Sequence, residues 1–558
     1  MHASNDAAEL AQGIAGLGAV HSLIRDRGGA AKNVIRLTTP LFFALVLSAL
    51  VLPAAAAAPV ITGVLNNYSL TLPGYPNSGI APSTLFIITG TDLANATAGP
   101  VTLQSTAAPG LPATLNGASI SVTAGGTTVT PGLYYALPTQ LAAVLPASTP
   151  PGAASVTVTL SGTPSASFQF QVAPAAPGLD TYYGTGGGLI TATDSVTGAL
   201  INFTSSATPG QTIVLWGSGL GADLADSDTV YTTSPHPVNQ SSTQVYFGTV
   251  EGTVLYAGSS GYPGLNQINV TIPANVPLGC RVSVVAVVGG VDSNFALIPI
   301  NPGGGVCSDS IYNSDGTRLS TSVTSTVTSG IASINQLQNS QLAGVTFVSD
   351  VDGNGYTALG PLSLGGCGVT QGSGPAQYGG TLTYLNAGTV SMQGPEGTYA
   401  LTSTTGATPD GAELPSGAIP ASGGTFTFTG TGSAEVGPFS VTVNLSPLMT
   451  WTNSGAAATV TRSQGLEINW SGGQPSSYIQ IIGQSVSSTP GIGATFQCFV
   501  PQSAMTFTVP PYVLNALPAG SGTMQVENFT ADVPFVVTGV EIPYSHGGNT
   551  ISVKSKFQ

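Results

Sequence analysis

The stretch Pro82-Ser-Thr-Leu-Phe-Ile-Ile-Thr-Gly-Thr-Asp-Leu93 has a counterpart 127 residues later, Pro209-Gly-Gln-Thr-Ile-Val-Leu-Trp-Gly-Ser-Gly-Leu220. Each copy is a β-branched, apolar run that ends at a glycine and reaches a leucine three residues later. The match continues at the same offset, where Gln140, Pro146 and Gly152 fall on Gln267, Pro273 and Gly279. One residue later in register, Ser165 falls on Ser293. Since chance rarely keeps register over so long a span, we interpret the two stretches as copies of one domain.

Both copies alternate apolar and polar residues with a period of two. Val156, Val158 and Leu160 alternate with threonine, and the second copy repeats the pattern at Ile268, Val270 and Ile272. Such alternation describes strands with one buried and one wet face, and Pro and Gly clusters separate the runs at short intervals. The sequence therefore predicts an all-β protein of tandem immunoglobulin-like β-sandwich domains, each of about 100 residues.

The residues at the glycine ends of the two runs resemble a sequence motif of a known family. Gly90-Thr-Asp-Leu93 and Gly217-Ser-Gly-Leu220 look like the opening of immunoglobulin-like TIG (IPT) domains. The run Gly264-Leu-Asn-Gln-Ile-Asn-Val-Thr-Ile-Pro273 is similar to a TIG-like domain of secreted acidobacterial proteins, and Val288-Gly-Gly-Val-Asp-Ser-Asn294 extends the likeness. The resemblance covers residues 60 to 303 and implies a fold and export, because this family has no assigned biochemical activity.

The repeat and the Gly-Pro clusters suggest a division of the chain. The expected units are a leader with a secretory signal peptide (1–56), two TIG-like domains (57–178 and 179–303), a β-rich domain (304–450), an Ig-like β domain (451–545) and a short tail (546–558). In the fifth unit, Phe507 to Leu514 is expected to be a strand that enters a short helical turn.

The charge of the chain argues against two classes of partner. Only 6% of the 558 residues are charged, and no Lys or Arg lies between Leu37 and Cys280. Binding to nucleic acid or to an anionic membrane rests on clustered basic side chains. Nucleic acid is therefore not expected as a partner.

A secretory signal is expected near the start of the sequence. Four basic residues precede the apolar run Pro40–Leu52, and Ala54 to Ala58 follow it, which is the order of a cleavable signal with a site after Ala56 or Ala57. A membrane anchor is the alternative, but a spanning helix needs about 20 apolar residues. We expect a secreted or cell-surface protein with no integral membrane segment after signal removal. Translation starting downstream of Met1 at a non-Met codon would explain the long leader.

Four cysteines remain after the leader. Export favours disulfides, and four cysteines allow three pairings. We favour Cys280 with Cys307 and Cys367 with Cys498, since these pairings link the same or neighbouring proposed domains. No C-x-x-C spacing of a zinc site is present.

Residues for catalysis are scarce. Only His236 and His546 remain after the leader, neither lies near a nucleophile elbow, and both are interpreted as solvated loop residues. Asp223, Asp226 and Asp228 share one loop. The sequence leaves two interpretations of them open, the paired carboxylates of a glycosidase or a solvated turn. We therefore expect no enzyme.

One loop has the pattern of a cation site. Asp350, Asp352 and Asn354 stand at alternate positions before Gly355, a spacing with which a short loop wraps Ca²⁺. The alternative is a hairpin turn, for which Asp-Gly and Asn-Gly are common. Calcium is the one cofactor that the sequence suggests.

Two tyrosine doublets, Tyr134-Tyr135 and Tyr182-Tyr183, are candidate stacking platforms for sugars, or else packing residues. With no catalytic signal, the sequence favours an exported, non-catalytic interaction or adhesion protein of the cell envelope. Its partner would be a cell-surface or extracellular protein or a glycan. A carbohydrate-binding or polysaccharide-processing protein is the alternative.

Overall fold

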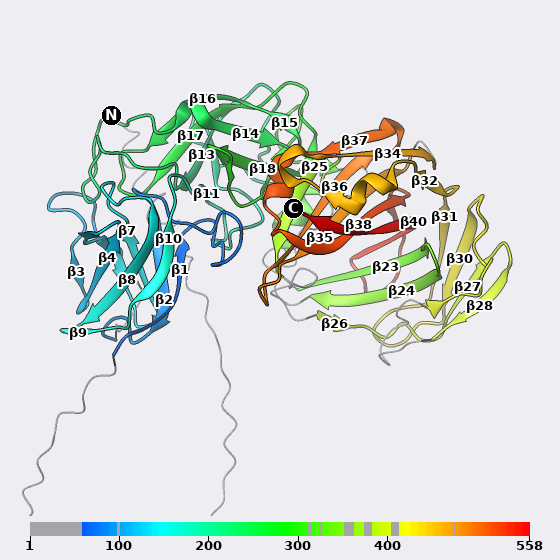
Figure 1. Cartoon of the computed structure of the whole chain (residues 1–558). Coiled ribbons are helices and arrows are strands. Elements are labelled where there is room, and N and C mark those ends of the chain that lie inside the picture. Colours follow the sequence, from blue (N-terminus) through cyan, green and yellow to red (C-terminus); the bar gives the residue numbers. More distant parts are fainter. Residues whose placement is uncertain are drawn as a thin grey trace, which may run out of the picture.

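A computed structural model gives the structure of the chain. It describes residues 58–96, 101–309, 314–322, 326–350, 362–372, 382–402, 412–473 and 476–558. Antiparallel sheets make up most of this part, which confirms the all-β class (Figure 1). The expected leader, residues 1–56, lies outside the described residues.

The first repeat is a sandwich of two antiparallel sheets around one apolar core. One sheet has the order β1 (Val60–Asn66), β2 (Leu85–Thr91), β7 (Gln140–Val144) and β6 (Gly132–Ala136). The other has the order β10 (Phe168–Val172), β8 (Gly152–Leu160), β4 (Ala118–Ala124) and β3 (Thr114–Leu115), with β5 (Thr127–Val129) and β9 (Thr163–Pro164) beside it.

The second repeat has the same arrangement. Its first sheet contains β11 (Gly178–Leu179), β13 (Thr212–Ser218), β17 (Asn266–Thr271) and β16 (Thr253–Ser259), with β12 (Ala192–Asp194) against β13. The facing sheet contains β15 (Val250–Glu251), β14 (Thr243–Phe247), β18 (Gly279–Val288), β19 (Val291–Asp292) and β20 (Ala296–Ile300). A 3-10 turn, η1 (Gln240–Ser242), precedes β14.

The register of the strands confirms the internal repeat. Leu85 pairs with Val144 in the first sandwich, and the residues 127 positions later, Thr212 and Thr271, pair in the second. The expected one-residue shift is also present. The Ser165 hydroxyl accepts a hydrogen bond from Val158 N and donates to Ala166 O, and the Ser293 hydroxyl makes the same two bonds with Ala286 N and Asn294 O.

A short connection leads to the C-terminal unit. It contains β21 (Ser308–Asp309), β22 (Ser314–Asp315) and α2 (Gly316–Ser322). In the described part, α2 has seven residues, α3 (Pro511–Asn515) has five, and no helix there is long and apolar enough to cross a membrane. The expected strand before a helical turn is confirmed, because β37 (Thr506–Val509) precedes α3.

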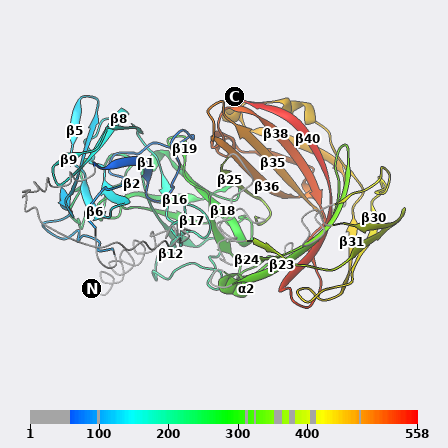
Figure 2. The same ribbon diagram turned by 90° about the horizontal axis from the view of Figure 1, so that it is seen from below.

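One curved sheet of eleven strands, counted over the described residues, runs through the whole C-terminal unit. Its main path is β25 (Gly366–Gln371), β36 (Gly493–Pro501), β35 (Tyr478–Val486), β38 (Gly520–Phe529), β40 (Ile542–Phe557), β23 (Val327–Gln336), β24 (Gln341–Asp350) and β26 (Leu382–Tyr384). The strands β29 (Ala412–Glu413), β33 (Thr459–Val460) and β39 (Val533–Pro534) pair beside this path. Figure 2 shows the curvature, which carries the sheet from β36 through β40 to β24.

Two smaller sheets pack on this large sheet. The first has the order β28 (Gly397–Leu401), β27 (Val390–Gly394), β30 (Gly424–Gly430) and β31 (Phe439–Leu445), and it shares a core with β23 and β24. The second consists of β32 (Met449–Trp451), β34 (Leu466–Gly472) and β37, and it shares a core with β35, β36 and β38. Among its described residues the unit also contains the 3-10 turns η3 (Ser454–Ala458), η4 (Arg462–Gln464) and η5 (Gln502–Ala504).

The C-terminal unit differs from the expected division in two respects. Strand β23 pairs in parallel with β40, so residues on both sides of the expected boundary at 450 share one sheet. The expected polar tail, residues 546–558, forms most of β40, because its backbone completes the ladders of β23 and β38.

Two disulfides are present, and they are the favoured pairs. Cys280 at the start of β18 is bonded to Cys307, and Cys367 on β25 is bonded to Cys498 on β36. Cys367 and Cys498 also face each other in the ladder of the two strands.

Candidate functional site

The loop after β13, residues 219–239, brings two carboxylates and a histidine together. Asp223, Asp226 and His236 each present one ligand atom, and these atoms all lie within 4.8 Å of one another. The sequence treated the two separately: the histidine was interpreted as a solvated loop residue, and the acidic cluster was left open between paired carboxylates and a solvated turn. The structure places them in one half-buried group instead.

Local hydrogen bonds shape the first half of this loop. Ala225 N donates to the Asp223 carboxylate at 3.0 Å, and Ser227 N donates to that of Asp226 at 2.8 Å. Short polar side chains that bond to nearby backbone amides favour tight turns over regular structure. The acidic residues therefore curl back toward the end of β16.

Backbone pairing with β16 positions the histidine. Val238 N donates to Ala257 O at 2.9 Å, and Pro237 forms an isolated bridge with Gly258. The Tyr256 hydroxyl donates to His236 O at 2.8 Å. These bonds hold the backbone at His236 and directly after it, and they place the histidine beside the two carboxylates.

Burial and hydrogen bonding differ among the members of the group. Asp223 is 8% exposed, and its Oδ2 atom is buried without a hydrogen-bond partner, as is the Nδ1 atom of His236. The carboxylate of Asp226 accepts bonds from the hydroxyls of Thr232, at 2.6 Å, and Ser259. Burial raises the pKa of Tyr256 to about 12, and the charges of Asp223 and Asp226 add to the effect.

Asp228, the third acidic residue of the loop, has a different role. Both of its carboxylate oxygens lie within hydrogen-bond distance of Ala147 N in the first repeat, at 3.0 and 3.1 Å. Burial raises the pKa of Asp228 to about 6, against the effect of this bond and with a further increase from Asp226 and Asp223. Asp228 therefore joins the two repeats, while Asp223 and Asp226 face the histidine.

The second histidine lies in the C-terminal unit. His546 is on β40, and its Nδ1 atom is 3.0 Å from Oδ1 of Asp532. Its ring contacts Phe529 at a centroid distance of 4.9 Å, so it is a partly buried strand residue rather than a solvated loop residue. Nearby, burial raises the pKa of Glu527 to about 7, against the effects of Thr550 and His546.

The calcium prediction lies almost wholly outside the described residues. Asp350 is the last residue of β24, and its backbone pairs with Leu382. Asp352 and Asn354 are not among the described residues. The calcium loop stays a prediction.

Neither tyrosine doublet forms a flat platform. The Tyr134 hydroxyl donates to Pro263 O of the second repeat at 2.7 Å, which makes Tyr134 a packing residue between the repeats. Tyr182 is exposed, but its ring meets that of Tyr183 edge to face, at 83°. A sugar ring stacks on a flat face, which this edge-to-face pair lacks.

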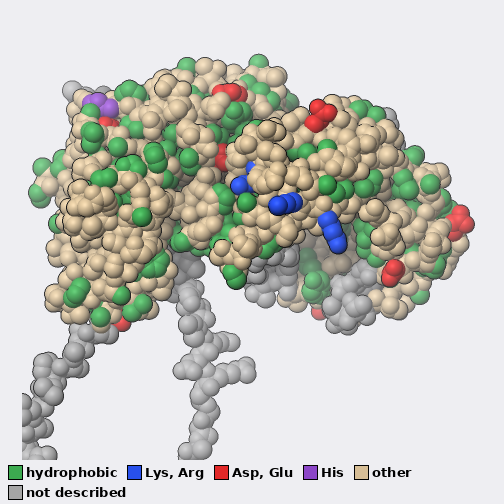
Figure 3. Space-filling model, viewed as in Figure 1, with side chains coloured by type: hydrophobic (Ala, Val, Ile, Leu, Met, Phe, Trp, Pro, Cys, Tyr) green, Lys and Arg blue, Asp and Glu red, His purple; other side chains and the backbone are tan. Residues whose placement is uncertain are grey.

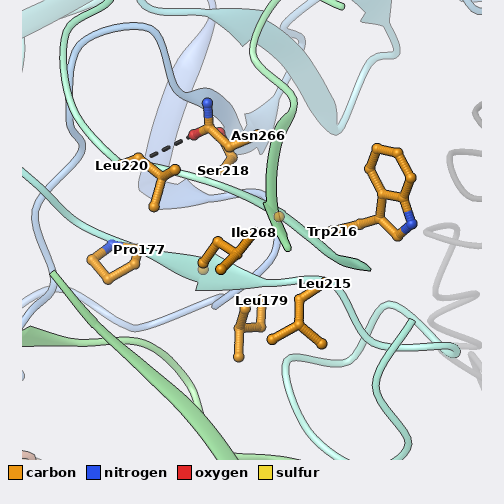
Figure 4. Close-up of a pocket in the computed structure, with 10 residues that line it drawn as sticks. Pro177, Leu179, Leu215, Trp216, Ser218, Leu220, Asn266 and Ile268 are labelled. Atoms are coloured by element: carbon orange, nitrogen blue, oxygen red, sulfur yellow. Dashed lines mark hydrogen bonds between the residues drawn. The ribbon is translucent and has the colours of Figure 1, made fainter. Parts of the chain in front are cut away.

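Two hollows in the described part are small or shallow. The first, between strands of the second repeat, has a volume of about 10 Å³, the space of a single water molecule. Figure 4 shows apolar side chains around it, with Leu220 N donating to Asn266 at 3.1 Å. The second, of about 210 Å³, is lined mainly by Ser and Thr residues of the C-terminal unit. Neither resembles the deep apolar pocket typical of small-molecule sites.

Comparisons with known proteins find only distant likenesses. No protein-family model matches the chain. No curated protein matches it either. Among solved structures, it is similar to a Bacteroides ovatus protein of a mixed-linkage glucan utilization locus, SGBP-B, in complex with a mixed-linkage heptasaccharide. The identity is 12%, the match covers 81% of this chain and 97% of that one, and the TM-score is 0.15.

Two further structures show the same level of likeness. Chicken CNTN1 FN1–FN3 domains share 9% identity over 66% of this chain and 98% of that one, with a TM-score of 0.15. The N-terminal part of the bacterial S-layer protein SbsC shares 13% identity over 44% of this chain and 45% of that one, again with a TM-score of 0.15. At such scores these likenesses carry no argument about function. The topology of its sheets shows that the chain is an all-β protein of tandem immunoglobulin-like β-sandwiches.

Proposed function

We propose that this chain is an exported, non-catalytic interaction protein of the cell envelope or extracellular space, which works as a rigid array of β-sandwiches. In this proposal the leader, residues 1–56, directs export, and the TIG-like units are 57–178 and 179–303. The observation that carries the proposal is that each sandwich is fixed to the next by specific contacts rather than joined by a free linker.

Hydrogen bonds across the junction fix the first repeat to the second. Leu85 N donates to the Ser218 hydroxyl at 3.0 Å, and the Tyr134 hydroxyl donates to Pro263 O at 2.7 Å. The loop after β13 contributes a further bond, from Leu111 N to Thr229 O at 2.9 Å. Several such bonds over one surface disfavour bending between the two sandwiches.

Apolar contacts fix the second repeat to the C-terminal unit. Val285 and Val287 of β18 point into the core of that unit rather than into their own. The ring of Tyr512 stacks on that of Tyr246 at a centroid distance of 4.4 Å, and its hydroxyl donates to Gly248 O at 3.1 Å. An apolar interface of this kind limits the relative motion expected between domains.

The surface and the disulfides agree with an extracellular role. Figure 3 shows a face covered mostly by neutral side chains, with the few basic ones gathered over the C-terminal unit. The chain has two disulfides, and disulfides form and persist mainly in oxidising compartments. Binding in tandem sandwiches commonly resides in end loops, which a rigid array would present at fixed spacing.

The proposal is tested on cells that produce the chain. Antibodies against residues 57–558 are expected to label intact cells or to detect the protein in the medium, and the exported protein is expected to begin near Ala57. A protein found only in the cytoplasm, with Met1 retained, would contradict export.

A glycan array probed with residues 57–558 separates the two classes of partner. Binding to a defined glycan without its cleavage would identify a glycan partner within the proposal. Hydrolysis of an array glycan would contradict the non-catalytic function and support the polysaccharide-processing alternative.

A further inference from the structure

The group formed by Asp223, Asp226 and His236 has the composition of a cation site. Two carboxylates and one imidazole offer oxygen and nitrogen ligands from three points of one loop, with their ligand atoms within 4.8 Å of one another. Zinc and similar divalent ions accept this mixed donor set, whereas calcium prefers oxygen ligands alone.

Two ligand atoms of the group are buried and lack partners. Oδ2 of Asp223 is inaccessible to water and makes no hydrogen bond, and Asp223 as a whole is 8% exposed. Nδ1 of His236 is likewise buried without a partner. Leaving such polar atoms unsatisfied is unfavourable, and most so for a charged carboxylate. A bound cation would satisfy both atoms at once.

The sequence around this loop supplies no Lys or Arg to compensate the carboxylates. The sequence has no Lys or Arg between Leu37 and Cys280, and the loop adds Asp228 to Asp223 and Asp226. Buried charges in proteins are usually paired or coordinate a metal. The only residue of this loop that could carry a positive charge is His236, which as a ligand would be neutral.

The outer contacts of the group resemble those that orient metal ligands. The Thr232 hydroxyl donates to Asp226 at 2.6 Å, and the Ser259 hydroxyl donates to its other oxygen. Hydrogen bonds of this kind fix the orientation of a ligating carboxylate.

We propose that Asp223, Asp226 and His236 bind one divalent cation of the zinc class. Backbone bonds from the same loop reach the first repeat, from Asp223 N to the Ser83 hydroxyl at 3.1 Å and from Tyr231 N to Thr106 O at 2.6 Å. The ion therefore stiffens the junction between the two repeats. This inference is independent of the partner proposed above.

The test is zinc binding by residues 57–558, prepared without a polyhistidine tag and stripped with EDTA. Isothermal titration with ZnCl₂ is expected to show one site, and zinc is expected to raise the melting temperature. The absence of zinc uptake, or an unchanged melting temperature at saturation, would overturn the proposal.

Variants assign the site to its residues. Asp226→Asn and His236→Gln are each expected to weaken zinc binding by at least about tenfold, in line with the loss of a ligand. His546→Gln is the matched control, because it removes the other histidine of the exported chain and leaves the group intact. Circular dichroism confirms that each variant is folded. Parent-like zinc affinity in folded His236→Gln, or loss of binding in the control, would overturn the assignment.

Discussion

Gly90 and Gly217 occupy equivalent places, at the end of β2 and β13, and both are required by a close backbone contact. A Cβ atom at Gly90 would lie 2.0 Å from Val60 O, and one at Gly217 would lie 2.1 Å from Gly178 O. The leucine that follows each glycine, Leu93 or Leu220, is buried in its own core. The glycine motif that revealed the repeat is therefore a packing motif. A neighbouring strand passes so close to the glycine Cα atom that no side chain fits there.

Gly217→Ala is expected to destabilise the second repeat. The added methyl group collides with a carbonyl oxygen, and overpacking of this kind costs about 1–3 kcal/mol. Thermal unfolding followed by circular dichroism measures the loss. Gly303→Ala is the control, because a Cβ atom there meets nothing within 4 Å. Equal melting temperatures for the two variants would contradict the close contact.

Asp180 makes the stability of the second repeat depend on pH. The side chain is 3% exposed, and burial raises its pKa to about 7 against hydrogen bonds from Thr191 and Thr181. Between pH about 4 and about 7 the folded state holds a proton that the unfolded state has released. Stability therefore falls as the pH rises through this window.

Asp180→Asn removes this contribution. The free energy of unfolding of the variant, relative to the parent, is expected to rise with pH from about 4 and to level off above about 7. Urea unfolding at a series of pH values measures the difference. A difference that stays constant from pH 4 to pH 8 would show that Asp180 does not titrate in this window.

The sequence could predict the residues of the candidate site but not that they lie close together in the fold. Asp223, Asp226 and Asp228 were evident as a cluster, and His236 as a Pro-bounded loop residue. What joins them is the isolated bridge between Pro237 of the irregular loop and Gly258 of β16, and a single bridge of this kind leaves no periodic pattern in the sequence. The scarcity of basic residues near three aspartates was the available signal for a cation.

Strand β18 contains a continuous apolar run, Val284 to Val288, and this run shows how burial on both faces of a strand is encoded. The valine-rich stretch of this strand ends at Val288, and all ten of its residues are buried. Val282, Val284, Ala286 and Val288 lie in the core of the second repeat, and Val285 and Val287 lie in that of the C-terminal unit. A continuous apolar run is typical of a strand that is covered on both faces. Here it marks the interface between domains.

Val285→Ala is expected to loosen the C-terminal unit, although Val285 belongs to the second repeat. Removing two buried methyl groups costs about 1.5–3 kcal/mol. Hydrogen exchange is expected to rise in α3 and β37. In the matched control Val284→Ala, the rise is expected in β13 and β17 instead. The same exchange pattern in both variants would contradict the two-sided burial of β18.

Strand β40 shows the limit of prediction from local pattern. Residues 546–558 are mostly polar, with glycines and lysines, and were expected to form a tail. In the structure they pair along almost their whole length with β38 and in part with β23. Pairing of β40 with β23 joins segments about 200 residues apart, and no short-range pattern encodes such a partner. The repeat, in contrast, was predicted because its two copies could be compared with each other.

At the scale of the whole molecule, we infer that the sandwiches form a single rigid body. Hydrogen bonds close the junction between the repeats, and β18 shares its two faces between two cores. The Tyr75 hydroxyl of the first repeat also donates to Gly491 O of the C-terminal unit, at 3.2 Å. Contacts between segments so far apart in sequence leave little freedom at either junction.

Small-angle X-ray scattering of residues 57–558 tests this claim most directly. We expect one conformation, with the sandwiches arranged as in Figure 1, to fit the scattering curve, and the normalised Kratky plot to be bell-shaped. A Kratky plot that stays raised at high angle, fitted only by an ensemble of independently moving sandwiches, would contradict it.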